Sequence, residues 1–152
     1  MSYRNKNLLV VGGTGFIGEA FSIKSLSYGY SVTVLSRGNK EFNRKLRNVE
    51  YLTADITDFK SLSNVLSSRR FTHVVNLGGY INHATFQNGG DDVIDQHYGA
   101  VKALVQCLDW ESLECFLQIG SSDEYGNAGA PQAESERELP ISPYSFGKFA
   151  AT

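Results

Sequence analysis

The chain contains few of the residues that form cross-links or bind metals. It has only two cysteines, Cys107 and Cys115, and three histidines among 152 residues. Two cysteines are too few for a disulfide framework or a thiolate metal cluster, so we expect buried free thiols. The histidines, His73, His83 and His97, do not have metal-ligand spacing. The sequence therefore predicts no metal site.

The sequence also lacks a strong excess of charge and a long apolar run. Its formal net charge is −2, from 14 basic and 16 acidic residues, which does not predict a nucleic-acid surface. No apolar run approaches the roughly 20 residues that span a bilayer, and the polar segment 1–7 has no signal-peptide pattern. We expect a cytoplasmic protein with neither a membrane nor a nucleic-acid partner.

What is present is the pattern of a globular α/β protein. Short β-branched runs alternate with amphipathic segments, which predicts a parallel sheet with right-handed crossovers. The fold class is therefore α/β, a Rossmann-like, doubly wound parallel sheet. The predicted strands, expected to be buried on both faces, are 8–11, 31–35, 49–53, 73–77 and 115–119. Helices are predicted from about residue 16, over 59–66 after the N-cap Asp58, and over about 92–108, with a loop over 126–140.

A glycine-rich loop joins the first predicted strand to the first helix. Gly12, Gly15 and Gly18 stand in the order G-x-x-G-x-x-G. Missing side chains allow the turn to close, a pyrophosphate to approach and the helix to pack, while the helix N-terminus offers N–H groups to the anion. The loop predicts dinucleotide binding, with a tight structural turn as the alternative. Its predicted cofactor contacts are Gly12, Thr14, Gly15, Phe16, Ile17 and Gly18. We expect the helix to bury an apolar face of Phe16, Ile17, Ala20, Phe21 and Ile23.

Three further strand ends are predicted to complete the same pocket. The second strand ends in Ser36 and Arg37, where an acid would bind the adenosine ribose and repel a 2′-phosphate. A hydroxyl and a guanidinium suit a phosphate, which favours NADP(H), with NAD(H) as the alternative and a solvated arginine as the structural explanation. We expect the adenine edge to lie after the third strand and the dinucleotide to lie close to the backbone after the fourth. The residues concerned are Asp55 and Ile56, then Leu77, Gly78 and Gly79.

Candidate catalytic residues occur near the C-terminal end. Tyr144 and Lys148 are four apart on a predicted helix and so share one face. A phenol with its ordinary pKa near 10 is a poor base at neutral pH, but a neighbouring ammonium stabilises the phenolate. Ser121 and Ser122 end the fifth strand, where an open α/β sheet presents its ligands. The pattern predicts proton transfer by Tyr144; the alternative is a half-buried aromatic beside an accidental lysine.

Five segments in chain order carry a family resemblance: VVGGTGFIG, ADITD, VVNLGG, GSSDEYG and SPYSFGK. They resemble the motifs of extended short-chain dehydrogenase/reductases, the NAD(P)-dependent nucleotide-sugar epimerase/dehydratase family. The resemblance implies a nicotinamide cofactor across Gly12–Gly18, catalytic Ser121, Tyr144 and Lys148, a nucleoside-diphosphate sugar, and a homodimer of the full-length form. It also implies that Tyr144 exchanges a proton with the sugar 4-hydroxyl, that Lys148 holds the cofactor ribose and tunes Tyr144, and that both residues contact the cofactor.

The sequence departs from the family pattern in two side chains and in length. Gln96 stands where many members have asparagine, and Ser122 supplies no acid where dehydratases have one, leaving Asp123 with a shorter reach. An epimerase or 4-ketoreductase is therefore favoured over a 4,6-dehydratase, and Arg37 favours reduction. Family members continue for a similar length again. We thus expect residues 1–152 to be an incomplete NAD(P)-binding domain without its sugar-binding region, inactive alone; a dinucleotide-binding module without turnover is the alternative.

Overall fold

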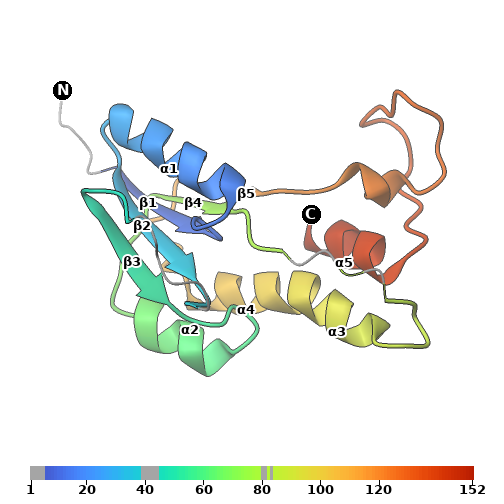
Figure 1. Ribbon diagram of the computed structural model, residues 1–152, viewed down its shortest axis with the longest axis horizontal. Coiled ribbons are helices and arrows are strands. Elements are labelled where there is room, and N and C mark those ends of the chain that lie inside the picture. Colours follow the sequence, from blue (N-terminus) through green and yellow to red (C-terminus); the bar gives the residue numbers. More distant parts are fainter. Residues whose placement is uncertain (1–5, 39–44, 80–81, 83) are drawn as a thin grey trace.

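The computed structural model, which describes residues 6–38, 45–79, 82 and 84–152, contains a five-stranded parallel sheet (Figure 1). The strand order is β3-β2-β1-β4-β5. The strands are β1 (Asn7–Val11), β2 (Ser31–Ser36), β3 (Val49–Thr53), β4 (His73–Asn76) and β5 (Cys115–Gln118). The order turns back between β1 and β4, which is the topological switch point of a doubly wound sheet. The predicted Rossmann-like fold is therefore confirmed.

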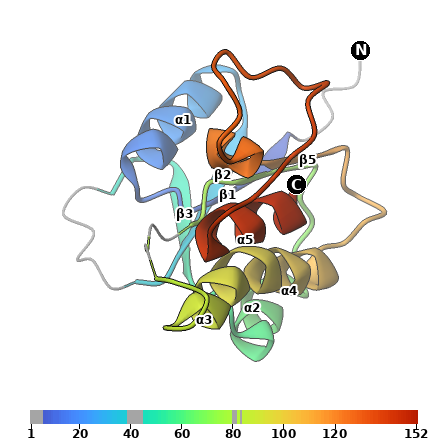
Figure 2. The same ribbon diagram turned by 90° about the vertical axis from the view of Figure 1, so that its right-hand side faces the viewer.

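Helices connect the strands and cover both faces of the sheet (Figure 2). They are α1 (Phe16–Ser27), α2 (Phe59–Leu66), α3 (Gly90–Ile94), the π-helical turn η1 (Asp95–Gly99), α4 (Ala100–Cys107), the 3₁₀ turn η2 (Ser122–Tyr125) and α5 (Pro143–Ala151). Asp58 accepts the Lys60 N–H at 2.9 Å and caps α2, as predicted. The predicted helix 92–108 begins two residues earlier, at Gly90, and η1 interrupts it.

Two apolar cores lie on opposite faces of the sheet because alternate residues of a strand point to opposite sides. Leu9 and Val11 of β1 pack in the core beneath α2 and α4. Leu8 and Val10 pack in the second core, which includes Phe21 of α1. Each fully buried side chain of this size stabilises the fold by roughly 1.5–3 kcal/mol. The cores hold the carboxyl ends of β1, β2 and β4 at one edge, where the site lies.

The predicted inner face of α1 is wrong except at Phe21, which is partly buried against the second core. Phe16 is 95% exposed and Ile17 is 63% exposed, whereas the buried residues of α1 are Gly18, Ser22 and Ser25. The helix begins directly at the glycine loop and lies so close to it that only small residues fit. Ser22 Oγ donates to the Gly18 carbonyl at 2.7 Å, which satisfies its hydroxyl within the helix.

The edge strands are also less buried than expected. Strands β3 and β5 alternate between exposed and partly buried residues, because each lies at an edge of the sheet. Cys115 of β5 is exposed and Cys107 is only partly buried, so the predicted burial of both thiols is wrong. Within the described ranges, no helix is both long enough and apolar enough to cross a membrane.

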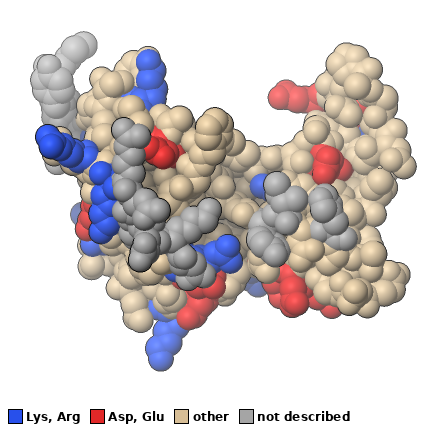
Figure 3. Space-filling view, viewed as in Figure 1, with Lys and Arg blue, Asp and Glu red and all other residues tan. Residues whose placement is uncertain are grey.

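The segment after β5 stands off from the sheet. Turn η2 and residues 126–140 form an arm at the far end of the molecule from β3 (Figure 1). Residues 126–140 contain no helix or strand, as predicted. The space-filling view shows the surface hollowed between this arm and the sheet, and acidic side chains on the arm (Figure 3).

Candidate active site

One pocket lies at the carboxyl ends of β1, β2, β3 and β4. It has a volume of about 280 Å³. Its lining residues are Val11, Gly12, Thr14, Gly15, Leu35, Ser36, Arg37, Gly38, Asp55, Ile56, Thr57, Leu77, Gly78, Gly79 and Gln96. Most of the predicted cofactor contacts are therefore brought together. Five of them lie outside this lining: Phe16, Ile17 and Gly18 of α1, the first two with exposed side chains, and Tyr144 and Lys148 of α5.

The glycines of the loop serve two different purposes. A Cβ on Gly18 would lie 2.5 Å from the Gly12 carbonyl oxygen, and one on Gly12 would lie 3.0 Å from the Gly78 nitrogen. These two glycines are required by packing, and Gly12 also has φ of +75°. A Cβ on Gly15 would meet only the Gly12 oxygen, at 3.4 Å. The protein itself does not need glycine at 15, which leaves the mouth of the pocket open in front of the N-terminus of α1.

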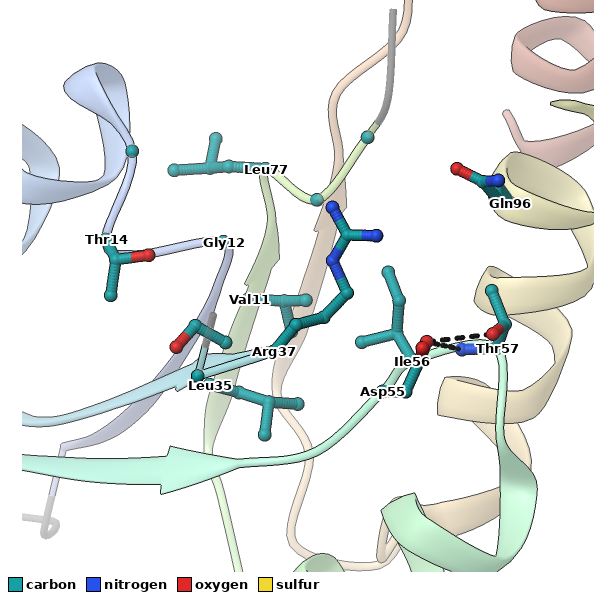
Figure 4. Close-up of a pocket in the computed structure, with 15 residues that line it drawn as sticks. Val11, Gly12, Thr14, Leu35, Arg37, Asp55, Ile56, Thr57, Leu77 and Gln96 are labelled. Atoms are coloured by element: carbon teal, nitrogen blue, oxygen red, sulfur yellow. Dashed lines mark hydrogen bonds between the residues drawn. The ribbon is translucent and has the colours of Figure 1, made fainter. Parts of the chain in front are cut away.

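The polar residues Ser36 and Asp55, at the ends of β2 and β3, differ in their hydrogen bonds. Ser36 Oγ is buried and has no hydrogen-bond partner among the described residues. Asp55 Oδ1 accepts the Thr57 N–H at 2.9 Å and the Thr57 hydroxyl at 2.8 Å. The backbone bond is the main cause that lowers the pKa of Asp55, and Arg37 lowers it further. Figure 4 shows the Arg37 side chain extending across the pocket, with Thr14 on one side and Gln96 on the other.

This environment fits a phosphorylated ligand. A buried hydroxyl is normally hydrogen-bonded, so the unpartnered Ser36 Oγ is suited to a polar ligand atom. The exposed Arg37 guanidinium supplies a positive charge in the same lining. Gly15 leaves room for a group that approaches the backbone of the loop. The residues present therefore match the requirements of a dinucleotide.

The helix that carries Tyr144 and Lys148 is fixed at its start. Ser142 Oγ accepts the Ser145 N–H at 3.1 Å, and Ser145 Oγ accepts the Ser142 N–H at 2.9 Å. Pro143 occupies the first helical position, where its missing N–H costs nothing. These contacts produce the predicted helix and place Tyr144 and Lys148 one turn apart.

Lys148 connects this helix to the fifth strand and to the pocket. It is only 6% exposed, and its Nζ donates to the Ile119 carbonyl at 3.0 Å. A Cβ on Gly79 would lie 3.6 Å from this Nζ, so the ammonium reaches the rim of the pocket. Burial lowers the pKa of Lys148, and the charge of Glu124 acts in the opposite direction.

Ser121 begins turn η2. Its Oγ accepts the Asp123 N–H at 3.2 Å, and its N–H donates to Glu124 Oε1 at 2.6 Å. Ser122 and Asp123 are exposed. Turn η2 packs against α5, so the chain brings the Ser121 turn and the Tyr144 helix into one corner.

Two buried ionisable residues of this corner were not found from the sequence. His97 is 4% exposed and its ring meets the Tyr144 ring edge-to-face, with centroids 5.1 Å apart. Glu124 is 8% exposed. Turn η1 explains His97, because a π-helical turn shifts the register of a helix and often marks a functional site. The same turn places Gln96 in the pocket lining. No local sequence signal would have indicated that His97 and Glu124 are buried.

Among the residues that the structure describes, no group of three or more histidine, cysteine, aspartate or glutamate side chains is placed to hold a metal ion. His83 lies outside those residues.

The fold defines the chain as a member of the Rossmann class, and sequence comparison gives its family. The NAD-dependent epimerase/dehydratase family matches residues 8–152, so the chain belongs to this family. It is 27% identical to a UDP-glucose 4-epimerase of Rhizobium meliloti over 150 residues, which cover 96% of this chain and 45% of the relative. It is also 27% identical to GDP-mannose 4,6 dehydratase 2 of Arabidopsis thaliana, with 96% and 44% coverage.

A solved structure shows the same fold. A short-chain dehydrogenase/reductase superfamily protein from Agrobacterium tumefaciens, crystallised with bound NAD, superposes with a TM-score of 0.76 at 20% identity. The match covers 95% of this chain and 42% of that one. The chain therefore spans less than half the length of these proteins.

Proposed function

We propose that this chain is the cofactor-binding half of an NAD(P)-dependent epimerase or 4-ketoreductase that acts at C4 of a nucleoside-diphosphate sugar. One observation carries the proposal: the buried Lys148 ammonium reaches the rim of the pocket at Gly79 from the same helix that presents Tyr144. A proton-transfer group and a dinucleotide site are thereby joined. The named activities of the two relatives support a nucleotide sugar as the substrate class.

The residues that would hold the cofactor are those of the pocket. The N-terminus of α1 and the open position at Gly15 suit the pyrophosphate. Ser36 and Arg37 suit a 2′-phosphate, which supports NADP(H). NAD(H) is the alternative, supported by the family description. When bound, the nicotinamide ring would accept the hydride from C4 of the sugar or donate it to that carbon.

Tyr144 is proposed to be the acid/base. Its phenolate takes the proton of the sugar 4-hydroxyl as that oxygen becomes a carbonyl, and returns a proton when the carbonyl is reduced. The Lys148 ammonium stabilises the phenolate electrostatically, and the Ser121 hydroxyl bonds the reacting oxygen. The edge-to-face contact with His97 restricts the orientation of the Tyr144 ring.

A 4,6-dehydratase is the second candidate, because one relative carries that name. Elimination requires an acid or base that can reach the sugar. Asp123 is exposed on η2, while both Glu124 carboxylate oxygens accept hydrogen bonds from within the corner. This bonding favours an epimerase or reductase over a dehydratase.

The test uses the full-length protein and a panel of UDP- and GDP-sugars, with products separated by chromatography. Tyr144→Phe should lower kcat by about 10² to 10⁴, the range of a positioned proton-transfer group, and leave the cofactor Kd unchanged. Lys148→Met should also weaken cofactor binding. Tyr98→Phe is the matched control, since Tyr98 is exposed on η1.

Unchanged kcat in Tyr144→Phe would remove Tyr144 as the acid/base. Cofactor binding by the full-length protein without turnover of any sugar would instead favour a dinucleotide-binding module.

A further inference from the structure

We propose that Glu124 is a positioning residue that ties the Ser121 turn, the last turn of α5 and the Lys148 ammonium into one unit. The inference rests on the proposed function, because Ser121 and Lys148 are the groups that it positions. Glu124 belongs to η2, and it is nearly completely buried.

Both carboxylate oxygens of Glu124 are used. Oε1 accepts the Ser121 N–H at 2.6 Å, a short distance typical of a bond to a charged acceptor. Oε2 accepts the Thr152 hydroxyl at 2.9 Å, and that hydroxyl also donates toward the Lys148 carbonyl at 3.1 Å. A Cβ on Gly120 would lie 2.8 Å from Oε1, so glycine at 120 leaves the space that the carboxylate occupies.

Helix capping explains only part of the hydrogen bonding of Glu124. Glu124 stands three residues after Ser121, and a glutamate there bonds the N-cap N–H in a capping box. Glutamine serves that purpose equally well. The bond to Thr152 goes beyond capping. A buried carboxylate is costly unless it is hydrogen-bonded and compensated, and the buried Lys148 ammonium of the same corner carries the opposite charge.

The electrostatic role concerns Lys148. Its ammonium is buried, which favours the neutral amine, and the Glu124 charge opposes that effect. Several other titratable groups lie on the elements that pack against α5. They are Asp91 and Asp92 on α3, Asp95 and His97 on η1, Asp123 on η2, and Tyr144 on α5 itself. The structure places Glu124 near this ammonium: its Oε1 would lie 2.8 Å from a Cβ on Gly120, and the carbonyl of the preceding residue, Ile119, accepts a hydrogen bond from the Lys148 Nζ.

The experiment is an NMR titration of Lys148 in the full-length protein. The side-chain CεHε signals are assigned by their loss in Lys148→Met. Glu124→Gln retains the capping bond to Ser121 and removes the charge, so it should lower the pKa of Lys148 relative to wild type. Asp123→Asn removes an exposed acid of the same turn and should leave the Lys148 titration unchanged. If Lys148 titrated in Glu124→Gln as it does in wild type, Glu124 would act only as a helix cap, and the proposal would be overturned.

A second measurement covers the case in which Glu124→Gln does not fold. In the wild-type protein, the Lys148 signals should show a further step at acid pH as Glu124 takes up its proton, and Asp123→Asn should retain that step. A wild-type protein without it would contradict the proposal.

Neither titration requires turnover. The positioning role of Glu124 can therefore be refuted without refuting the proposed sugar chemistry, and the sugar chemistry can be refuted without refuting that role. Where turnover is found, Glu124→Gln should lower kcat about tenfold, as expected when a hydrogen bond to a charged acceptor becomes one to a neutral amide. The alkaline limb of its pH–rate profile should move to lower pH, a change that a helix cap alone does not produce.

Discussion

The pocket at the strand ends and the corner formed by η2 and α5 are built in different ways. The pocket consists of strand ends and glycines, and its walls include the buried Val11 and Leu35 of the two central strands. The corner formed by η2 and α5 is held by hydrogen bonds from side chains, such as that from Lys148 to Ile119. Backbone shape therefore sets the pocket, whereas long-range polar contacts set the corner.

The two regions also differ in burial. Near the corner, Leu117 is 45% exposed, Ile141 is 60% exposed and Phe149 is 41% exposed. Few buried apolar contacts are a feature of segments that open at low free energy. We therefore expect substitutions in the pocket and in the corner to have separable effects, and the following predictions test that separation.

The largest effects are expected within the glycine loop. Gly18→Ala places a Cβ 2.5 Å from backbone atoms of Gly12 and Gly13, so it should reduce the free energy of unfolding by roughly 3 kcal/mol or more. A Cβ at position 15 meets no such obstacle, and the backbone of Gly15 is extended with a φ of −79°, which valine can adopt. It should keep the fold and weaken dinucleotide binding by about 100-fold or more, because the side chain fills the place of a phosphate.

Urea unfolding followed by circular dichroism, and calorimetric titration with the cofactor, separate these two outcomes. Undiminished binding in Gly15→Val would show that the loop does not hold the phosphates. Normal stability in Gly18→Ala would refute the packing explanation.

An intermediate effect is expected at Arg37. The full-length protein should bind NADP(H) more tightly than NAD(H), and Arg37→Ala should reduce that preference about tenfold or more, the range for a hydrogen bond to a charged group. Arg70→Ala is the control, since Arg70 is exposed and pairs with Asp109 away from the pocket. Calorimetry with both cofactors measures the preference. Equal affinities in the wild-type protein would refute the NADP assignment.

The pocket could be predicted because its signals are local. A glycine spacing after a strand, or a polar residue at a strand end, fixes where a side chain lies once the sheet is parallel. Gly15, Arg37 and Asp55 were found in this way, and the parallel order brings them together. Phe16 and Ile17, predicted for the same site, lie outside the pocket lining with exposed side chains at the start of α1, and their contact with the cofactor stays a prediction.

The corner could be predicted only in part. The spacing of Tyr144 and Lys148 and the preceding serine and proline indicated a helix, which the structure confirms. The burial of His97 depends on the π-helical turn and on contact with α5, and the burial of Glu124 depends on Gly120 and Thr152. Such contacts join residues far apart in sequence, so no local pattern reveals them.

The smallest effect is expected at Asp55, and it tests whether the pocket's polar residues act locally. The Thr57 N–H is the main cause that lowers the pKa of Asp55 in the folded protein. A carboxyl with a lowered folded pKa adds stability above its unfolded pKa of about 3.9, and this stability is lost as pH falls through the folded pKa. Asp55→Asn should therefore be destabilised at pH 7, and the difference from wild type should shrink near pH 3.

The magnitude should be on the order of 0.5 kcal/mol, because Asp55 is exposed and solvent screens its charge. Urea unfolding at both pH values measures the difference, with Glu111→Gln, at another exposed acid, as the control. The Lys148 titration should be the same in Asp55→Asn and wild type, since Asp55 bonds only within its own turn. A changed Lys148 titration would show that the pocket and the corner are electrostatically coupled, and their separation would have to be abandoned.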